Sequence, residues 1–95
     1  MTGWSDVTGW WPQMVGPGLP FDTDKYFIVC PNVIGGCQGS TGPSSIAPDG
    51  KRYGSRFPAV TIRDMVAAEI AFSDAIGIKK YKLAVGPSLG GMRSL

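Results

Sequence analysis

The hydrophobic positions along the chain predict two buried strands with one helix between them. Residues 25–33 (KYFIVCPNV) form a continuous apolar run with aromatic and β-branched members, typical of a strand buried on both faces of a parallel sheet. Residues 79–86 (KKYKLAVG) predict a second strand, which is charged where it begins and apolar toward its end. An Ala-rich stretch over Ile62–Ile76 predicts a helix.

The expected helix carries signals at both ends. Thr61 is placed to cap its first turn, and the carboxylate of Asp64 would lie in the positive first turn. Gly77 would end the helix as the C′ residue. Glu69 and Ser73 interrupt the apolar side and leave no clean polar stripe, so we expect a largely buried helix packed on a sheet.

Two further segments complete the order of elements. Residues 9–16 predict about two helical turns, and residues 35–56 carry Gly or Pro every few positions without periodicity. A loop that long inside a compact domain is usually functional. The order of strand, long loop, helix, strand, tight turn and helix start predicts a βαβ unit of an α/β fold, within one small domain of 95 residues.

Composition excludes several classes of function. The net charge of +2 argues against nucleic acid as a partner. No apolar run reaches the ~18 residues that would span a bilayer, and the start of the chain lacks the features of a signal peptide. We therefore expect a cytoplasmic protein with Cys30 and Cys37 as reduced thiols. Because the chain has no histidine, it cannot by itself complete a Ser-His-Asp triad, a Cys-His dyad or a His-based metal site.

Residues 86–90 (GPSLG) match the pattern G-x-S-x-G between a predicted strand and a predicted helix, which is the setting of a nucleophile elbow. Ser88 would be the nucleophile, and the backbone amide of Leu89 would donate to the oxyanion that forms after attack. The alternative is a Gly-rich turn between strand and helix that holds a phosphate. Pro87 fixes φ at the position before the serine.

Residues 32–45 (NVIGGCQGSTGPSS) form a Gly/Ser-rich loop at the end of a predicted strand. Ligands of open α/β sheets bind at such strand ends, although a solvated loop is the simpler interpretation. Together with TGWSDVTGWWPQMVGPG, FPAVTIRDMV and VGPSLGGM, this loop makes the chain closely similar to the homoserine O-acetyltransferase family of the α/β-hydrolase superfamily. The resemblance runs nearly end to end, although family members usually carry Gly at the position of Pro87.

The resemblance implies an acyltransferase that moves acetyl from acetyl-CoA to the hydroxyl of L-homoserine for methionine synthesis, through an acyl-Ser88 intermediate. It implies no metal and no cofactor besides acetyl-CoA as substrate, and a homodimer. It also implies that the 95 residues are a fragment, inactive alone, because the triad acid and histidine follow the serine in this superfamily. A second oxyanion donor would lie near Met1 or Thr2.

The remaining candidates have simpler interpretations beside the functional ones. Arg93 follows the elbow and is a candidate substrate ligand; Trp10 and Trp11 either pack under a loop or line the site. Cys37 has no accompanying base, and the three lysines at 79, 80 and 82 are solvated or contact CoA phosphates. Alternative functions are a succinyl-CoA- or L-serine-using acyltransferase, an α/β-hydrolase esterase, and a non-catalytic phosphate-binding βαβ module.

Overall fold

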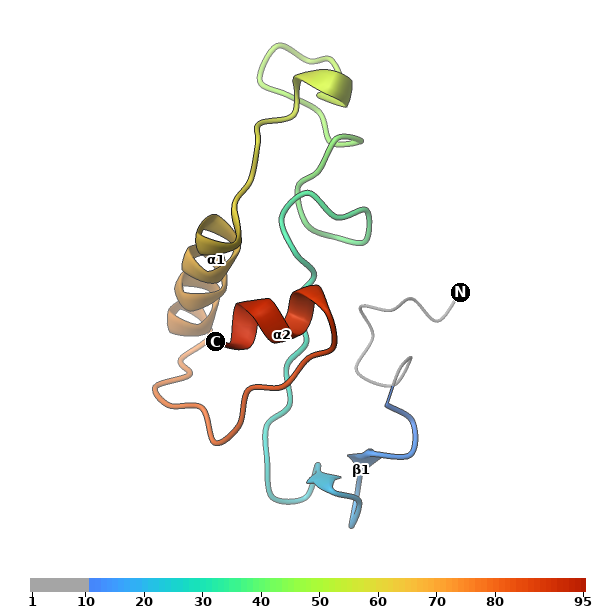
Figure 1. The fold of residues 1–95 in the computed structure, drawn as a ribbon, viewed down its shortest axis with the longest axis vertical. Helices are drawn as coiled ribbons and strands as arrows, with labels where there is room; N and C mark the ends of the chain where they lie inside the picture. Colours follow the sequence, from blue (N-terminus) through green and yellow to red (C-terminus); the bar gives the residue numbers. More distant parts are fainter. Residues whose placement is uncertain (1–10) are drawn as a thin grey trace. The chain divides into compact units, whose positions relative to one another are not determined.

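The computed structural model describes residues 11–95, which divide after Asn32 into two compact units (Figure 1). The described elements are two short strands in the first unit, and a 3-10 helix and two α-helices in the second. In chain order they are β1 (Val15–Gly16), β2 (Phe21–Asp22), η1 (Gly54–Arg56), α1 (Ile62–Ala75) and α2 (Leu89–Ser94).

The first unit is built on a turn and a two-stranded parallel ladder. The amide of Val15 donates to the carbonyl of Trp11 at 3.0 Å, and Val15 then pairs with Phe21 as β1 meets β2. The rings of Trp11 and Phe21 meet edge to face with centroids 5.9 Å apart. The expectation of a two-turn helix over residues 9–16 is wrong for residues 11–16, because the backbone of β1 pairs with β2 instead of continuing a helix. Residues 9 and 10 lie outside the described residues.

The two expected strands do not form ladders in the part of the chain that the structure describes. Residues 25–33 and 79–86 are extended or bent without a paired neighbour. A strand needs a second backbone alongside to satisfy its N–H and C=O groups, and residues 11–95 place none there. Phe27 is accordingly 78% exposed and Leu83 61% exposed, where a strand buried on both faces was expected.

Helix α1 is confirmed close to its expected bounds. Thr61 is extended, with φ −90° and ψ 164°, and its hydroxyl accepts from the Asp64 amide at 3.1 Å. The Asp64 carboxylate in turn accepts from the Thr61 amide at 2.8 Å, which completes a capping box. Gly77 follows the helix with φ +83°, as expected of a C′ residue.

The expectation that α1 is largely buried is wrong. Ile70 and Phe72 are exposed, and Ser73 is the buried residue of the helix. The Ser73 hydroxyl lies within 2.7 Å of the Glu69 carbonyl and also hydrogen-bonds the hydroxyl of Tyr81. The polar residues that interrupt the apolar side of α1 therefore have polar interaction partners. No sheet among residues 11–95 covers that side of the helix.

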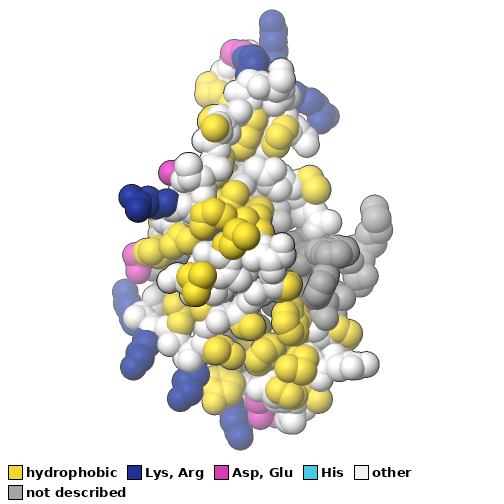
Figure 2. All heavy atoms as spheres, viewed as in Figure 1, with side chains coloured by type: hydrophobic (Ala, Val, Ile, Leu, Met, Phe, Trp, Pro, Cys, Tyr) yellow, Lys and Arg dark blue, Asp and Glu magenta, His cyan; other side chains and the backbone are white. Residues whose placement is uncertain are grey.

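The described residues enclose very little hydrophobic core. Among residues 11–95, only Gly42, Ala47 and Ser73 are buried, and no large side chain is fully enclosed. Figure 2 shows hydrophobic side chains open to solvent between the charged ones. Burial of apolar surface is the main favourable term in folding, and residues 11–95 bury little of it to offset the loss of conformational entropy.

We expect the isolated 95-residue chain to bind ANS and to lose structure over a broad temperature range. Its exposed apolar side chains offer the dye a surface, and its small core supports little cooperativity. Dye fluorescence and calorimetry on the purified chain measure both. A sharp two-state transition of a soluble monomer would contradict this expectation.

Replacing Thr61 by Ala should reduce the helical content of α1, since the Thr61 hydroxyl accepts from the Asp64 amide and donates to the Asp64 carboxylate, and both hydrogen bonds would be lost. Loss of such a cap costs about 1 kcal/mol of helix stability. Far-UV circular dichroism of the 95-residue chain measures the change. Thr61→Ser keeps the hydroxyl and should retain the helical signal.

The capping box should also weaken in acid. Hydrogen bonds from the Thr61 amide and hydroxyl hold the pKa of the Asp64 carboxyl below its ordinary value of 3.8. Because the folded pKa is the lower one, the contribution of Asp64 is present above pH 3.8 and is lost as the pH falls through the folded pKa. The amide proton shift of Thr61, followed by NMR, should titrate in this range and should become flat in Asp64→Asn.

Candidate active site

Ser88 has the most unusual backbone geometry in the described chain. Its φ of +50° and ψ of −121° make it the one non-glycine residue with positive φ among residues 11–95. Such a conformation costs of order 1–3 kcal/mol and persists only where the surroundings impose it. The expectation that Ser88 lies at a sharp turn before a helix starting near Leu89 is confirmed, although the segment before it is not a paired strand.

The turn leaves no room for a side chain at position 86. A Cβ placed on Gly86 would lie 2.7 Å from the carbonyl carbon of Gly90 and 2.8 Å from its Cα. The amide of Gly90 donates to the Pro87 carbonyl at 2.9 Å, which closes the turn around Ser88. Glycine at 86 therefore permits the backbone contact that aims Ser88 outward, whereas any larger residue would have to open it.

The backbone amide of Leu89 lies at the first position of α2, where a helix offers no acceptor of its own. It is therefore placed to donate to a ligand, and its role in an oxyanion hole stays a prediction. The proposed second donor near Met1 or Thr2 lies outside the described residues.

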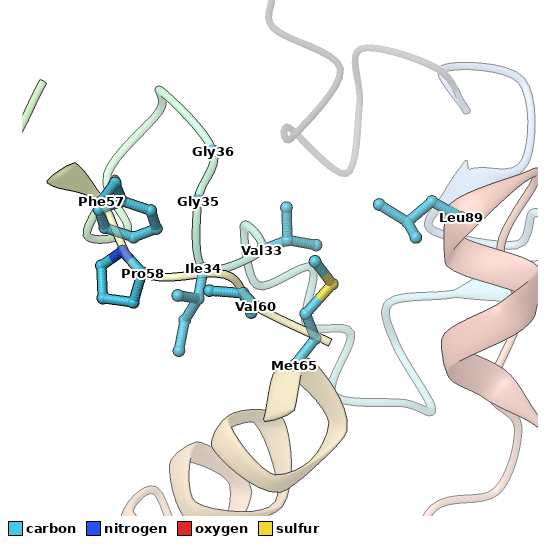
Figure 3. Close-up of a pocket in the computed structure, with 9 residues that line it drawn as sticks. All are labelled: Val33, Ile34, Gly35, Gly36, Phe57, Pro58, Val60, Met65 and Leu89. Atoms are coloured by element: carbon cyan, nitrogen blue, oxygen red, sulfur yellow. The ribbon is translucent and has the colours of Figure 1, made fainter. Parts of the chain in front are cut away.

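An apolar hollow of about 330 Å³ opens beside this position (Figure 3). The side chains of Val33, Met65 and Leu89 point toward a common space, from the long loop, the first turn of α1 and the start of α2. Since none of the lining side chains titrates, the hollow suits an apolar group and offers no acid or base. The lining residues are Val33, Ile34, Gly35, Gly36, Phe57, Pro58, Val60, Met65 and Leu89.

The loop beside the hollow folds on itself by backbone hydrogen bonds. The amide of Gly35 donates to the Thr41 carbonyl at 2.8 Å, and the amide of Tyr53 donates to the Ser45 carbonyl at 3.0 Å. A Cβ on Gly42 would overlap the carbonyl oxygen of Gly36, so glycine is required where these two backbones touch. The loop is thus shaped by its sequence, which argues against the interpretation of a merely solvated segment.

The far end of the loop is held by Arg56. Its guanidinium pairs with the Asp49 carboxylate at 2.6 Å and donates to the Arg52 carbonyl at 3.0 Å. The same guanidinium, together with the Lys51 amide, keeps the pKa of Asp49 below its ordinary value. The charged groups here stabilise the loop.

Arg93, the candidate substrate ligand, is in ion-pair contact with Glu69 of α1. Its side chain is 17% exposed and that of Glu69 is 23% exposed. Sequence reasoning missed this pair, although Glu69 on an otherwise apolar side of the helix was its signal. A role of Arg93 in substrate binding stays a prediction.

Among the remaining candidates, the structure describes all but Trp10. Trp11 packs on Phe21 within the first unit, whereas Trp10 lies outside the described residues. Cys37 is exposed, and so are the lysines at 79, 80 and 82. Residues 11–95 contain no group of three side chains able to hold a metal ion, and none of their helices is long and apolar enough to cross a membrane.

Comparison with known proteins gives relatives over most of the chain. The homoserine O-acetyltransferase of Thermobifida fusca (strain YX) is 61% identical over 87 residues, which are 92% of this chain and 23% of that protein. The serine O-succinyltransferase of Emericella nidulans is 56% identical over 88 residues, covering 92% of this chain and 17% of that protein.

A solved structure agrees with these relatives. The crystal structure of esterase E22 superposes with a TM-score of 0.81 at 39% identity, over 90% of this chain and 25% of that one. The chain thus spans a quarter or less of each of these three proteins. The family model for the alpha/beta hydrolase fold matches residues 1–95. The expected partial α/β-hydrolase fold is thereby confirmed, and the chain belongs to the α/β-hydrolase fold family.

Proposed function

We propose that this chain is the nucleophile-bearing part of an acyltransferase that moves the acetyl group of acetyl-CoA to the hydroxyl of L-homoserine. The observation that carries the proposal is Ser88, held at φ +50° in a G-x-S-x-G turn at the start of α2. The identity to homoserine O-acetyltransferases, 61% for that of Thermobifida fusca, supports the choice of substrates.

In the first step, Ser88 Oγ attacks the thioester carbonyl of acetyl-CoA and loses its proton to a general base. The resulting oxyanion accepts a hydrogen bond from the amide of Leu89, the first residue of α2. When the tetrahedral intermediate collapses, the carbon–sulfur bond breaks, and the thiol of CoA leaves with the proton. The product is an acetyl ester on Ser88.

In the second step, the hydroxyl of L-homoserine attacks this ester, and Ser88 Oγ leaves and recovers a proton. In both steps, the same base takes the proton from the attacking hydroxyl and returns it to the leaving group. The 95 residues contain no histidine, so a histidine base would come from outside them. The enzyme would need no cofactor beyond the acyl donor, and we place it in the cytoplasm, in methionine biosynthesis, as a homodimer.

Two alternatives have specific support. The serine O-succinyltransferase relative favours succinyl-CoA and L-serine as the donor and acceptor. The likeness to esterase E22 favours water as acceptor, which would turn the same acyl-Ser88 intermediate into a hydrolase. Turnover of both CoA thioesters with homoserine, serine and water, measured on the full-length protein that carries this chain, distinguishes the three. Acetyl-CoA with homoserine should give the highest kcat/KM.

In that full-length protein, Ser88→Ala should lower acetyl transfer on the order of 10⁶-fold, as expected when a triad nucleophile is removed. Mass spectrometry of the wild-type protein with acetyl-CoA alone should show one acetyl group on Ser88, and the kinetics should be ping-pong. The isolated 95-residue chain should show neither, because a serine hydroxyl without a base is a weak nucleophile.

Cys37→Ala is the matched control, since Cys37 is the one cysteine of the Val33–Leu95 unit and is exposed. It should retain turnover within a few-fold of the wild type. Near-native turnover in Ser88→Ala together with inactivity in Cys37→Ala would overturn the assignment of the nucleophile.

A further inference from the structure

Helix α2 is a poor helix by its own sequence. It spans six residues, LGGMRS, of which two are glycine, and Ser88 at its N-cap makes no side-chain capping hydrogen bond. Glycine is among the weakest helix formers, and so short a helix is not stable alone. A Cβ on Gly91 would lie 3.0 Å from the Gly86 carbonyl oxygen, so a better helix former at position 91 would strain the turn. The orientation of α2 must therefore be set by another element.

Helix α1 contacts α2 within the Val33–Leu95 unit, and one ion pair joins their side chains. Arg93 Nη2 of α2 contacts Glu69 Oε1 of α1, and Figure 1 shows the C-terminal end of α2 beside α1. The two side chains are 17% and 23% exposed, against 52% and 47% for the pair of Arg56 and Asp49. Because removal of one partner would leave a largely desolvated charge unpaired, such a pair constrains geometry more than an exposed pair does.

A second attachment lies one turn along the same face of α1. Ser73 hydrogen-bonds the hydroxyl of Tyr81, which belongs to the segment that leads from α1 to the elbow. Ser73 also donates to the carbonyl of Glu69 at 2.7 Å. The chain on both sides of Ser88 is thus fastened to a single helix, before the turn at Tyr81 and after it at Arg93.

We propose that Glu69 is a positioning residue, which holds α2 through Arg93 and thereby fixes the direction in which Ser88 Oγ and the Leu89 amide point. This inference rests on the proposed role of Ser88 as nucleophile. Misplacement of a reacting group by 1 Å can cost about 10²-fold in rate, so loss of the pair should appear in the chemistry of Ser88 without any contact between Glu69 and substrate.

The test uses the full-length protein and a fluorophosphonate probe, which reports the reactivity of Ser88 without needing the acyl donor or the acceptor. Glu69→Gln should lower the second-order rate of Ser88 labelling at least tenfold. Hydrogen exchange of the peptide covering Leu89–Ser94 should become faster, while exchange of the first turn of α1 stays unchanged. The charge swap of Glu69→Arg with Arg93→Glu should recover labelling to within about threefold of the wild type.

Asp74→Asn is the matched control, because it removes the same charge from the same helix at an exposed position. It should label within twofold of the wild type. Glu69→Asp provides a second variant if Glu69→Gln does not fold: it keeps the charge at a shorter reach and should show slower labelling with an unchanged circular dichroism spectrum.

The outcomes separate the two proposals. A folded wild-type protein that is not labelled at Ser88 would overturn the proposed function. A labelled wild type, with Glu69→Gln or Glu69→Asp at the wild-type rate and with unchanged exchange over α2, would overturn the positioning role alone. Slow labelling of Asp74→Asn equal to that of Glu69→Gln would also overturn it, since a general loss of charge from α1 would then suffice.

Discussion

The contact between the backbones of Gly86 and Gly90 is the constraint on which the rest of the second unit depends. A Cβ on Gly86 would lie 2.7 Å from the carbonyl carbon of Gly90, so glycine at position 86 lets the chain reverse within a few residues and place Ser88 at φ +50°. Gly91 of α2 also lies against this turn, because a Cβ there would come within 3.0 Å of the Gly86 carbonyl oxygen, and the glycines of α2 weaken that helix. A turn that aims the serine outward therefore creates the need for an external support, which α1 supplies.

Helix α1 can supply that support because its own ends are fixed by local interactions. The reciprocal hydrogen bonds of Thr61 and Asp64 satisfy its first turn, and Gly77 ends it without strain. Its middle then presents Glu69 and Ser73, which pair with Arg93 and Tyr81 on either side of the elbow. The polar residues on its apolar side are thus attachment points for the chain that carries Ser88.

The elements that sequence reasoning located correctly are those whose signals are local. Thr61, Asp64 and Gly77 mark the ends of α1 within a few residues, and the G-x-S-x-G spacing marks the turn at Ser88. Residues 25–33 and 79–86 have the composition of strands, but a strand exists only when another backbone lies beside it, and composition does not supply one. Glu69 on the apolar side of α1 signalled a buried partner, but no spacing rule relates the two helices, so the sequence did not identify Arg93 as that partner.

The residues of this chain determine which catalytic tasks of the proposed site they can perform. They hold a serine in a strained turn, an amide at the start of α2 and an apolar hollow beside Leu89, all arranged by backbone contacts and one half-buried ion pair. They hold no histidine. Orientation and oxyanion stabilisation are geometric and can be built from glycines, amides and packing, whereas proton transfer needs a group that titrates near neutral pH. The geometry of attack would therefore be encoded here, and the base that drives it would be added by other residues.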